Sequence, residues 1–277
     1  MVLWIYVGIS GRTGISVKRQ YLDVLHEGFS VPKALRTDHG GETTMLADAH
    51  YSISKSLRTD DEETLRFINC FVFGTSTANQ RIEAWWGWLT KGQISMWRAY
   101  FERLIAHQLF SVKSRQDRIA FNVVYISVIR REVHHYMCLW NNHSIRNQRK
   151  RPTVVAGKPF LLYHYPELSE AVQCGMPADP AYMEEIREEV ADWDINEFLP
   201  KTTKERCDAN LLELGHDPSR FYTEDLFPNG TGERTHCRVY LDLRGAVTEH
   251  MAAQAADPGL VQLSLSQIPR GTWEVTE

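Results

Sequence analysis

Two carboxylates, Asp38 and Glu83, are the residues whose types and positions best suit chemistry in this 277-residue chain. Asp38 follows a short apolar segment that ends at Thr37, and Glu83 lies in the first turn of a helix expected to open near Asn79. Sites in α/β folds gather at the carboxyl ends of strands, and two carboxylates can share hard cations such as Mg²⁺. Two such ions would clamp the attacking and leaving oxygens of a phosphoryl transfer. The pair therefore suggests metal-dependent phosphoryl transfer.

The spacing of this pair is not specific by itself. The chain has 35 acidic residues, so many pairs of carboxylates could be chosen. On spacing alone, two solvated side chains near helix termini are the better explanation of Asp38 and Glu83. The surrounding elements and motifs must decide between the two interpretations.

The N-terminal part of the chain predicts alternating strands and helices. Residues 2–9 form a continuous apolar run that predicts a buried strand. Residues 16–27 place apolar side chains on one helical face. A short strand at 33–37 and a helix at about 42–56 follow. Strand, helix, strand, helix is the order of an α/β fold.

The remainder of the chain predicts a helical part followed by an irregular part. Apolar residues at helical spacing predict a helix from about residue 80 and a mostly helical stretch that continues to Trp140. A break follows at Pro152. Beyond it we expect one helix at 181–193, a strand at 237–243 and much irregular chain.

Charge is distributed unevenly, although the net charge is only −4. Residues 98–151 carry 11 basic and 3 acidic side chains, whereas residues 166–277 carry 9 basic and 22 acidic ones. A basic segment of this density can hold a phosphate backbone, and the acidic region would repel one. A solvated helix face is the alternative for the basic segment alone, but the asymmetry favours nucleic-acid binding. The basic residues of this segment that we expect to contact nucleic acid are Arg115, Arg118, Arg130, Arg131, Arg146 and Lys150.

Several classes of protein are excluded by composition. No apolar run approaches the roughly 20 residues that cross a bilayer, so we expect no membrane partner. The apolar stretch at 2–7 is too short for the core of a signal peptide and has no basic residue before it. Five widely spaced cysteines support neither a disulfide framework nor a zinc finger, and a core helix explains His134, His135, Cys138 and His143 better than a zinc site. We therefore expect an intracellular protein.

Three sequence blocks, in a fixed order, carry a resemblance to a known family. They are LRTDHGGET at 35–43, NQRIEAWWGWL at 79–89 and WNNHSIR at 140–146. These blocks resemble those of the integrase core domain family, which are retrotransposon- and transposon-related proteins with a ribonuclease H-like fold and a D-D-E triad. The resemblance covers roughly residues 2–165, and three ordered blocks are far more specific than a lone motif.

The resemblance implies a ribonuclease H-like α/β fold, with a mixed sheet flanked by helices, and metal-dependent DNA cleavage and strand transfer. Asp38 matches the second catalytic aspartate of the family and Glu83 its catalytic glutamate. Both would then be ligands of Mg²⁺ or Mn²⁺. Asn79 and Arg81 match the polar approach to the glutamate, where they would contact DNA phosphate or position the helix.

The first aspartate of the family lies on a strand that precedes the one at residues 2–9. We expect that strand and its aspartate to be absent from the chain, and Asp23 lies on the wrong element to replace it. Losing one of three anionic ligands weakens two-metal binding, so we expect catalysis to be incomplete. The competing hypothesis is a descendant without catalysis that binds nucleic acid or a protein.

The expected domain boundary follows the resemblance. Residues 1–151 would form the truncated ribonuclease H-like domain, and residues 152–277 a largely irregular acidic extension that binds a protein partner or mimics the charge of DNA. DNA is the main expected partner, and an oligomer is possible. A nuclear location follows from this function, with Arg149-Lys150-Arg151 as a weak basic cluster compatible with import.

Overall fold

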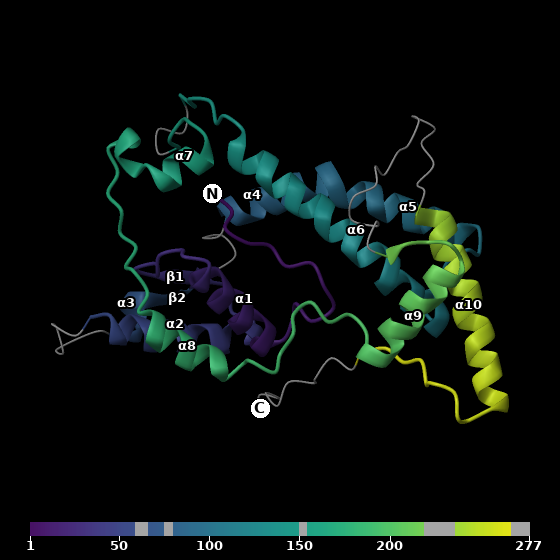
Figure 1. The fold of residues 1–277 in the computed structure, drawn as a ribbon. Helices are drawn as coiled ribbons and strands as arrows, with labels where there is room; N and C mark the ends of the chain where they lie inside the picture. The colour runs from purple at the N-terminus through teal and green to yellow at the C-terminus, as the bar shows by residue number, and fades with distance from the viewer. Residues whose placement is uncertain (59–65, 75–79, 150–153, 219–235, 267–277) are drawn as a thin grey trace.

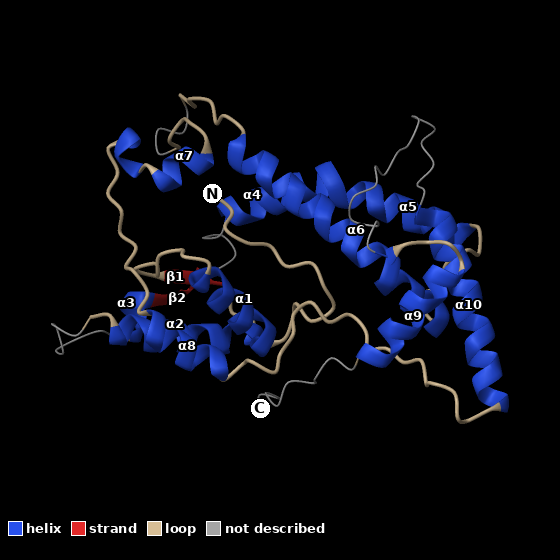
Figure 2. Cartoon of the chain, viewed as in Figure 1, coloured by secondary structure: helices blue, strands red, loops and turns tan. Residues whose placement is uncertain are grey.

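The computed structural model describes residues 1–58, 66–74, 80–149, 154–218 and 236–266. These residues are mostly helical and contain a two-stranded parallel sheet (Figure 2). In chain order the elements are α1 (Gly14–His26), β1 (Leu35–Thr37), the 3₁₀ turn η1 (Gly41–Thr43), α2 (Thr44–Ser56), α3 (Phe67–Cys70), β2 (Phe71–Phe73), α4 (Gln80–Leu89), the π-helical turn η3 (Thr90–Ile94), α5 (Ser95–Ala106), α6 (Arg115–Asn142), α7 (Pro159–His164), the 3₁₀ turn η4 (Pro166–Ser169), α8 (Pro180–Glu188), α9 (Lys201–Glu213) and α10 (His236–Ala256).

A first hydrophobic core, here named the sheet cluster, surrounds β1 and β2. The strands pair in parallel with Leu35 opposite Phe71. Tyr21 and Leu22 of α1 are buried there together with Ile53 of α2. The helix α8 from the acidic region completes the cluster. The predicted strand at 33–37 is present as β1, and the helices predicted at 16–27, about 42–56 and 181–193 are present as α1, α2 and the shorter α8.

One buried histidine gives the sheet cluster a polar centre. The Nδ1 atom of His50 lies 2.7 Å from the hydroxyl of Tyr21, and its Nε2 atom lies 3.4 Å from the hydroxyl of Ser54. Burial lowers the pKa of His50 to about 4, because the imidazolium form loses its hydration. The ring is therefore neutral at physiological pH.

A second core, the helical cluster, is formed by α5, α6, α9 and α10. Tyr240, Leu243 and Val247 of α10 are fully buried and lie three and four residues apart, the spacing of one helix face. They pack against Tyr125 of α6 and Leu211 of α9. The predicted strand at 237–243 is therefore wrong, because the alternating apolar residues there belong to the start of a 21-residue helix.

The N-terminal segment also differs from its prediction. Residues 2–7 have no regular secondary structure and residues 8–9 form a bend, so the predicted strand is wrong there too. Side chains of α6 satisfy their main-chain groups: Asn141 accepts from the Val2 amide at 2.8 Å and donates to the Val2 carbonyl at 2.8 Å. Farther along, Arg130 donates to the Val7 carbonyl at 2.6 Å. Main-chain polar groups need partners whatever their conformation, and here side chains replace a strand ladder.

A third, smaller core, the α4 cluster, joins this segment to two helices. Trp85 and Leu89 of α4 pack against Val133 of α6, and apolar side chains of residues 2–7 cover them. The long helix α6 thus takes part in two clusters, as Figure 1 shows by its course from the α4 side to α9 and α10.

The mixed sheet that we expected is not present in the described residues, where two parallel strands pair with each other. The acidic C-terminal region is more helical than predicted: α8 packs in the sheet cluster, and α9 and α10 pack in the helical cluster. The domain boundary at residue 151 stays a prediction. No helix in the described part of the chain is long and apolar enough to span a membrane.

Candidate metal and nucleic-acid site

Asp38 directly follows β1, at the carboxyl end of the parallel pair. The amide of Gly74 donates to the Thr37 carbonyl at 2.7 Å, which extends the pairing of β1 and β2 to this point. Beside it, the His39 ring stacks on Phe73 with ring centroids 5.3 Å apart. The Asp38 side chain itself is exposed and makes no ion pair with another described residue. Rigid neighbours therefore hold a solvent-facing carboxylate.

Glu83 lies in the first turn of α4. Its helix is fixed by Trp85, which is buried in the α4 cluster, whereas Glu83 and the neighbouring Arg81 are exposed. A negative charge in the first turn is favourable because the helix dipole is positive there. Asn79, which the resemblance also selects, lies outside the described residues.

The two carboxylates come from elements that pack in different cores. Asp38 follows β1, which packs in the sheet cluster, and Glu83 lies on α4, which packs in the α4 cluster. Their oxygen atoms are the type of ligand that Mg²⁺ and Mn²⁺ prefer. Within the described part of the chain, however, no group of three or more histidine, cysteine, aspartate or glutamate side chains is close enough to hold a metal ion. The carboxylate oxygens of Asp38 and Glu83 suit Mg²⁺ or Mn²⁺. The described residues, however, do not bring a third acidic ligand to this pair.

The predicted basic residues follow the length of α6. Arg115 and Arg118 lie in its first turns, Arg130 and Arg131 lie past its middle, and Arg146 follows its end. A helix of 28 residues is about 40 Å long, so these side chains form a line and not a compact cluster. Lys150 lies outside the described residues.

Arg130 differs from the other members of this line because its guanidinium holds the fold together. Besides the Val7 carbonyl, it donates to the side-chain oxygen of Asn196 at 2.6 Å and lies 4.6 Å from the centre of the Phe198 ring. By contrast, Arg115 is exposed and has no ion pair with another described residue. A role of Arg130 in DNA binding stays a prediction, and its structural role is plain.

The block WNNHSIR has a structural role. Asn141 is buried and holds residue Val2, and the Trp140 ring packs beside His143 with ring centroids 4.4 Å apart. The three tryptophans of α4 differ in burial. Trp85 is buried, whereas Trp86 is 44% exposed. Trp88 is 56% exposed and lies 5.7 Å from the Lys91 ammonium.

Comparison with protein families gives one match. The family model described as Integrase core domain matches residues 2–164, which is more than half of the chain and includes all three sequence blocks. No curated protein and no solved structure matches the chain.

Proposed function

The chain belongs to the integrase core domain family, and we propose that it binds DNA with Asp38 and Glu83 as carboxylate ligands of Mg²⁺ or Mn²⁺. The observation that carries this proposal is the place of Asp38. It is an exposed carboxylate without an ion pair among the described residues, at the carboxyl end of a parallel strand pair. It also lies inside a family block whose order along the chain is kept. We propose that the family's ribonuclease H-like arrangement underlies this part of the chain.

The line of arginines along α6 supports the DNA part of the proposal. About 40 Å of helix corresponds to about 12 base pairs of B-form DNA, since successive phosphates of one strand advance about 3.4 Å. Exposed guanidinium groups spaced along such a length suit a phosphate backbone better than a compact anion. Arg115, Arg118 and Arg146 are the exposed members of this line.

The carboxylates would act on the DNA only through the bound cation. When present, such a cation stabilises the charge that develops on the phosphate and its leaving oxygen. Asp38 and Glu83 would hold and orient it, and Arg81, two residues before Glu83, would meet a neighbouring phosphate. Cleavage and strand transfer need a third acidic ligand, which the described residues do not bring to this pair. We therefore propose catalysis only where such a ligand is supplied.

A second function, DNA binding without catalysis, is favoured by a different observation. The elements that carry Asp38 and Glu83 belong to separate hydrophobic cores, and no group of three metal-ligating side chains is gathered in the described residues. The acidic region that contains α8, α9 and α10 would then serve as a protein-binding surface.

Salt-dependent binding to a duplex of about 20 base pairs tests the proposal. Each phosphate contact that is lost should lower the slope of log K against log salt by about one. We expect this decrease for Arg115→Ala and Arg146→Ala. The matched control is Arg238→Ala, which removes an exposed arginine from α10 in the acidic region.

Two results would separate the candidate functions. Loss of duplex affinity in the α6 variants with an unchanged control supports DNA binding. Equal effects of all three substitutions would show that the arginine line is not the binding surface. Cleavage of the duplex in Mn²⁺ that is abolished by Asp38→Asn identifies the enzyme, and binding without cleavage identifies the second function.

A further inference from the structure

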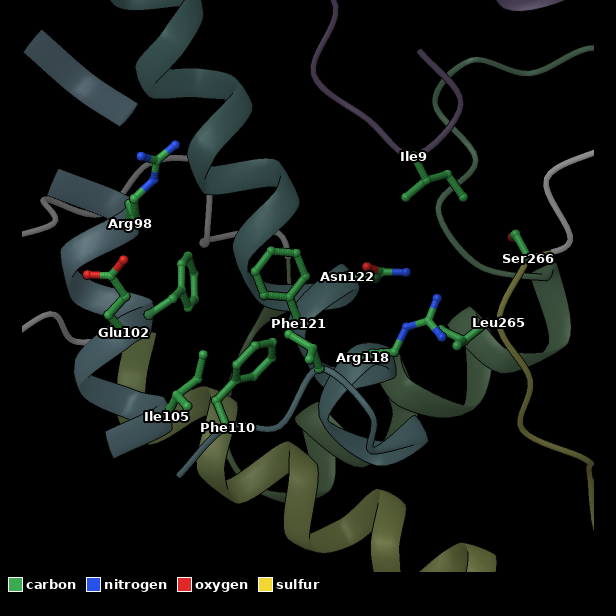
Figure 3. Close-up of a pocket in the computed structure, with 12 residues that line it drawn as sticks. Ile9, Arg98, Glu102, Ile105, Phe110, Arg118, Phe121, Asn122, Leu265 and Ser266 are labelled. Carbon is green, nitrogen blue, oxygen red and sulfur yellow. The ribbon is translucent and has the colours of Figure 1, made fainter. Parts of the chain in front are cut away.

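A cavity of about 500 Å³ lies between α5, the start of α6 and the chain that follows α10 (Figure 3). It is distinct from the carboxylates of the candidate metal site, because it is formed by the helical cluster and not by β1 or α4. The volume is within the range of pockets that bind small organic molecules. The lining residues are Ile9, Arg98, Phe101, Glu102, Ile105, Phe110, Val112, Arg118, Phe121, Asn122, Leu265 and Ser266.

Three phenylalanine rings form the apolar part of the cavity. Phe101 packs on Phe121 with ring centroids 5.1 Å apart and on Phe110 at 5.8 Å, and Phe110 packs on Phe121 at 5.8 Å. The buried Tyr125 also packs on Phe101, with ring centroids 5.0 Å apart. Rings packed so closely have few other rotamers, so they provide a pre-formed aromatic surface.

Two arginines lie at different ends of this aromatic surface. Figure 3 shows Arg98 beside Glu102 on α5, and Arg118 on the other side of the Phe110 and Phe121 rings, near Asn122 and Leu265. Both guanidinium groups are exposed, and neither makes an ion pair within the described chain. Asn122 donates to the Phe198 carbonyl at 3.1 Å, which fixes its amide.

The end of the cavity at Arg118 is the better place for an anion. Glu102 is the carboxylate that lines the cavity, and it lies one helical turn from Arg98, so it offsets the positive potential at that end. No carboxylate lines the cavity beside Arg118 among the described residues. Glu197 lies outside the lining and accepts from the Ser266 hydroxyl at 3.3 Å.

We propose that this cavity binds one unpaired nucleotide of a single-stranded nucleic acid, with the base against the phenyl rings and its phosphate on Arg118. The proposal rests on the proposed function, because it assigns the cavity to the same nucleic acid that the α6 arginines bind. Bases stack on aromatic side chains in a sequence-tolerant way, and guanidinium groups bind phosphate oxygens through paired hydrogen bonds. An aromatic surface and an uncompensated arginine in one cavity match both halves of a nucleotide.

The position of the cavity fits a role beside a duplex site. Arg115, in the duplex-binding line, lies three residues before Arg118 on α6, so both face nearly the same side of the helix. A strand that leaves the duplex near the start of α6 would meet Arg118 next. The cavity would thus hold an unpaired end or a displaced base.

The first test compares two arginines one helical turn apart. Affinities are measured for a labelled single strand of about 12 nucleotides and for a duplex of the same sequence. Arg115→Ala and Arg118→Ala remove the same charge from the same helix, so we expect similar losses of duplex affinity. For the single strand, Arg118→Ala should cost about tenfold more than Arg115→Ala, because it also removes the phosphate contact of the nucleotide held in the cavity.

The second test fills the cavity without changing its charge. Ile105 lines the cavity and is 48% exposed, so Ile105→Trp can be accommodated while occupying the space of the base. Met96, 40% exposed on the same helix and outside the cavity, gives the control Met96→Trp. Single-strand affinity should fall about tenfold in Ile105→Trp and stay unchanged in Met96→Trp. Duplex affinity should stay unchanged in both variants.

A mononucleotide separates failure of this proposal from failure of DNA binding. Thymidine monophosphate should bind the wild-type protein at millimolar concentration and protect it against thermal unfolding, and Ile105→Trp should abolish that protection. Duplex binding without any effect of Ile105→Trp on the single strand overturns the cavity proposal alone. Mononucleotide binding without duplex binding overturns the proposed function and leaves the cavity as a nucleotide site.

Discussion

The sheet cluster and the helical cluster place different chemistry at the surface. Around the sheet, buried residues from α1, α2 and α8 support a short parallel strand pair whose carboxyl end presents Asp38. The helical cluster is built from long helices, and its surface presents arginines along α6. One core supports a carboxylate suited to cations and the other supports guanidinium groups suited to phosphates.

This difference indicates that each core supports a different candidate function, metal binding beside the sheet and phosphate binding along α6. A metal site depends on sub-ångström geometry, so it needs rigid strand ends and closely placed elements. Phosphate binding needs only charges spaced along a length, which a single long helix supplies. On the proposed function, the helical cluster would bind DNA without help from the pair Asp38 and Glu83, whereas the pair would have no substrate without the arginines.

The largest loss of stability is expected when the buried carboxylate of the helical cluster, Asp117, is removed. Asp117 accepts from the Tyr240 hydroxyl at 2.5 Å and from the Ser111 amide at 3.2 Å, and it lies 3.6 Å from the Arg244 guanidinium. Asp117→Ala removes the carboxylate from all three partners, leaving the Leu109 carbonyl as the acceptor for Tyr240 and Arg244, and should lower the free energy of unfolding by about 3–4 kcal/mol. Urea denaturation followed by tryptophan fluorescence measures the loss.

The control for this prediction is an exposed ion pair in the same cluster. Asp208 pairs with Lys204 at 2.6 Å on the surface of α9, and Asp208→Ala should cost less than about 1 kcal/mol. Similar losses in Asp117→Ala and Asp208→Ala would contradict the importance of the buried group.

Lowering the pH should destabilise the sheet cluster, because His50 is buried beside it as a neutral ring. The unfolded chain protonates this ring below about pH 6.5, whereas the folded protein, with a pKa of about 4, does not. Stability is therefore complete above pH 6.5 and falls as the pH decreases toward 4, by about 2 kcal/mol between pH 7 and 4.5. Unfolding free energies at the two pH values measure this loss.

The variant His50→Gln isolates the contribution of the ring. It has no titrating group at this position, so its stability should fall less between pH 7 and 4.5 than that of the wild type. The same pH dependence in both proteins would show that His50 does not carry the effect.

The smallest of the expected effects concerns the tether between the N-terminal segment and α6. Asn141→Ala removes two hydrogen bonds to Val2 and should cost about 1–2 kcal/mol. Amide exchange at Val2 should become faster. Asn142→Ala is the matched control, because that neighbour is exposed and donates only to the Cys138 carbonyl in its own helix. Unchanged exchange at Val2 in Asn141→Ala would show that the apolar contacts alone hold the segment.

Local patterns predicted the elements next to Asp38 and Glu83. The apolar face of α1, the strand that ends at Thr37 and the start of α4 all follow from the spacing of neighbouring residues. The family blocks likewise located both carboxylates. What the sequence could not establish is how the cores that carry them are placed, because that depends on contacts distant along the chain.

Two wrong predictions, and one structural role that was not predicted, show this limit. Residues 2–9 have the composition of a strand, but their partners are side chains of α6 that lie more than 120 residues away in sequence. The segment 237–243 alternates apolar and polar residues like a strand, and only the continuation to Val247 indicates a helix face. Arg130 looked like a DNA ligand by charge, yet its contacts with Val7 and Asn196 are tertiary and leave no local pattern.

Mn²⁺ binding by the two carboxylates is the most direct test of the central claim. Melting temperatures with and without millimolar Mn²⁺ would be compared for the wild type, Asp38→Asn, Glu83→Gln and the control Asp48→Asn, which alters an exposed aspartate of α2. We predict a rise of a few degrees in the wild type and control, since an ion that binds only the folded state stabilises it. The rise should be lost in Asp38→Asn and Glu83→Gln. An equal rise in all four proteins would contradict the assignment of this pair as metal ligands.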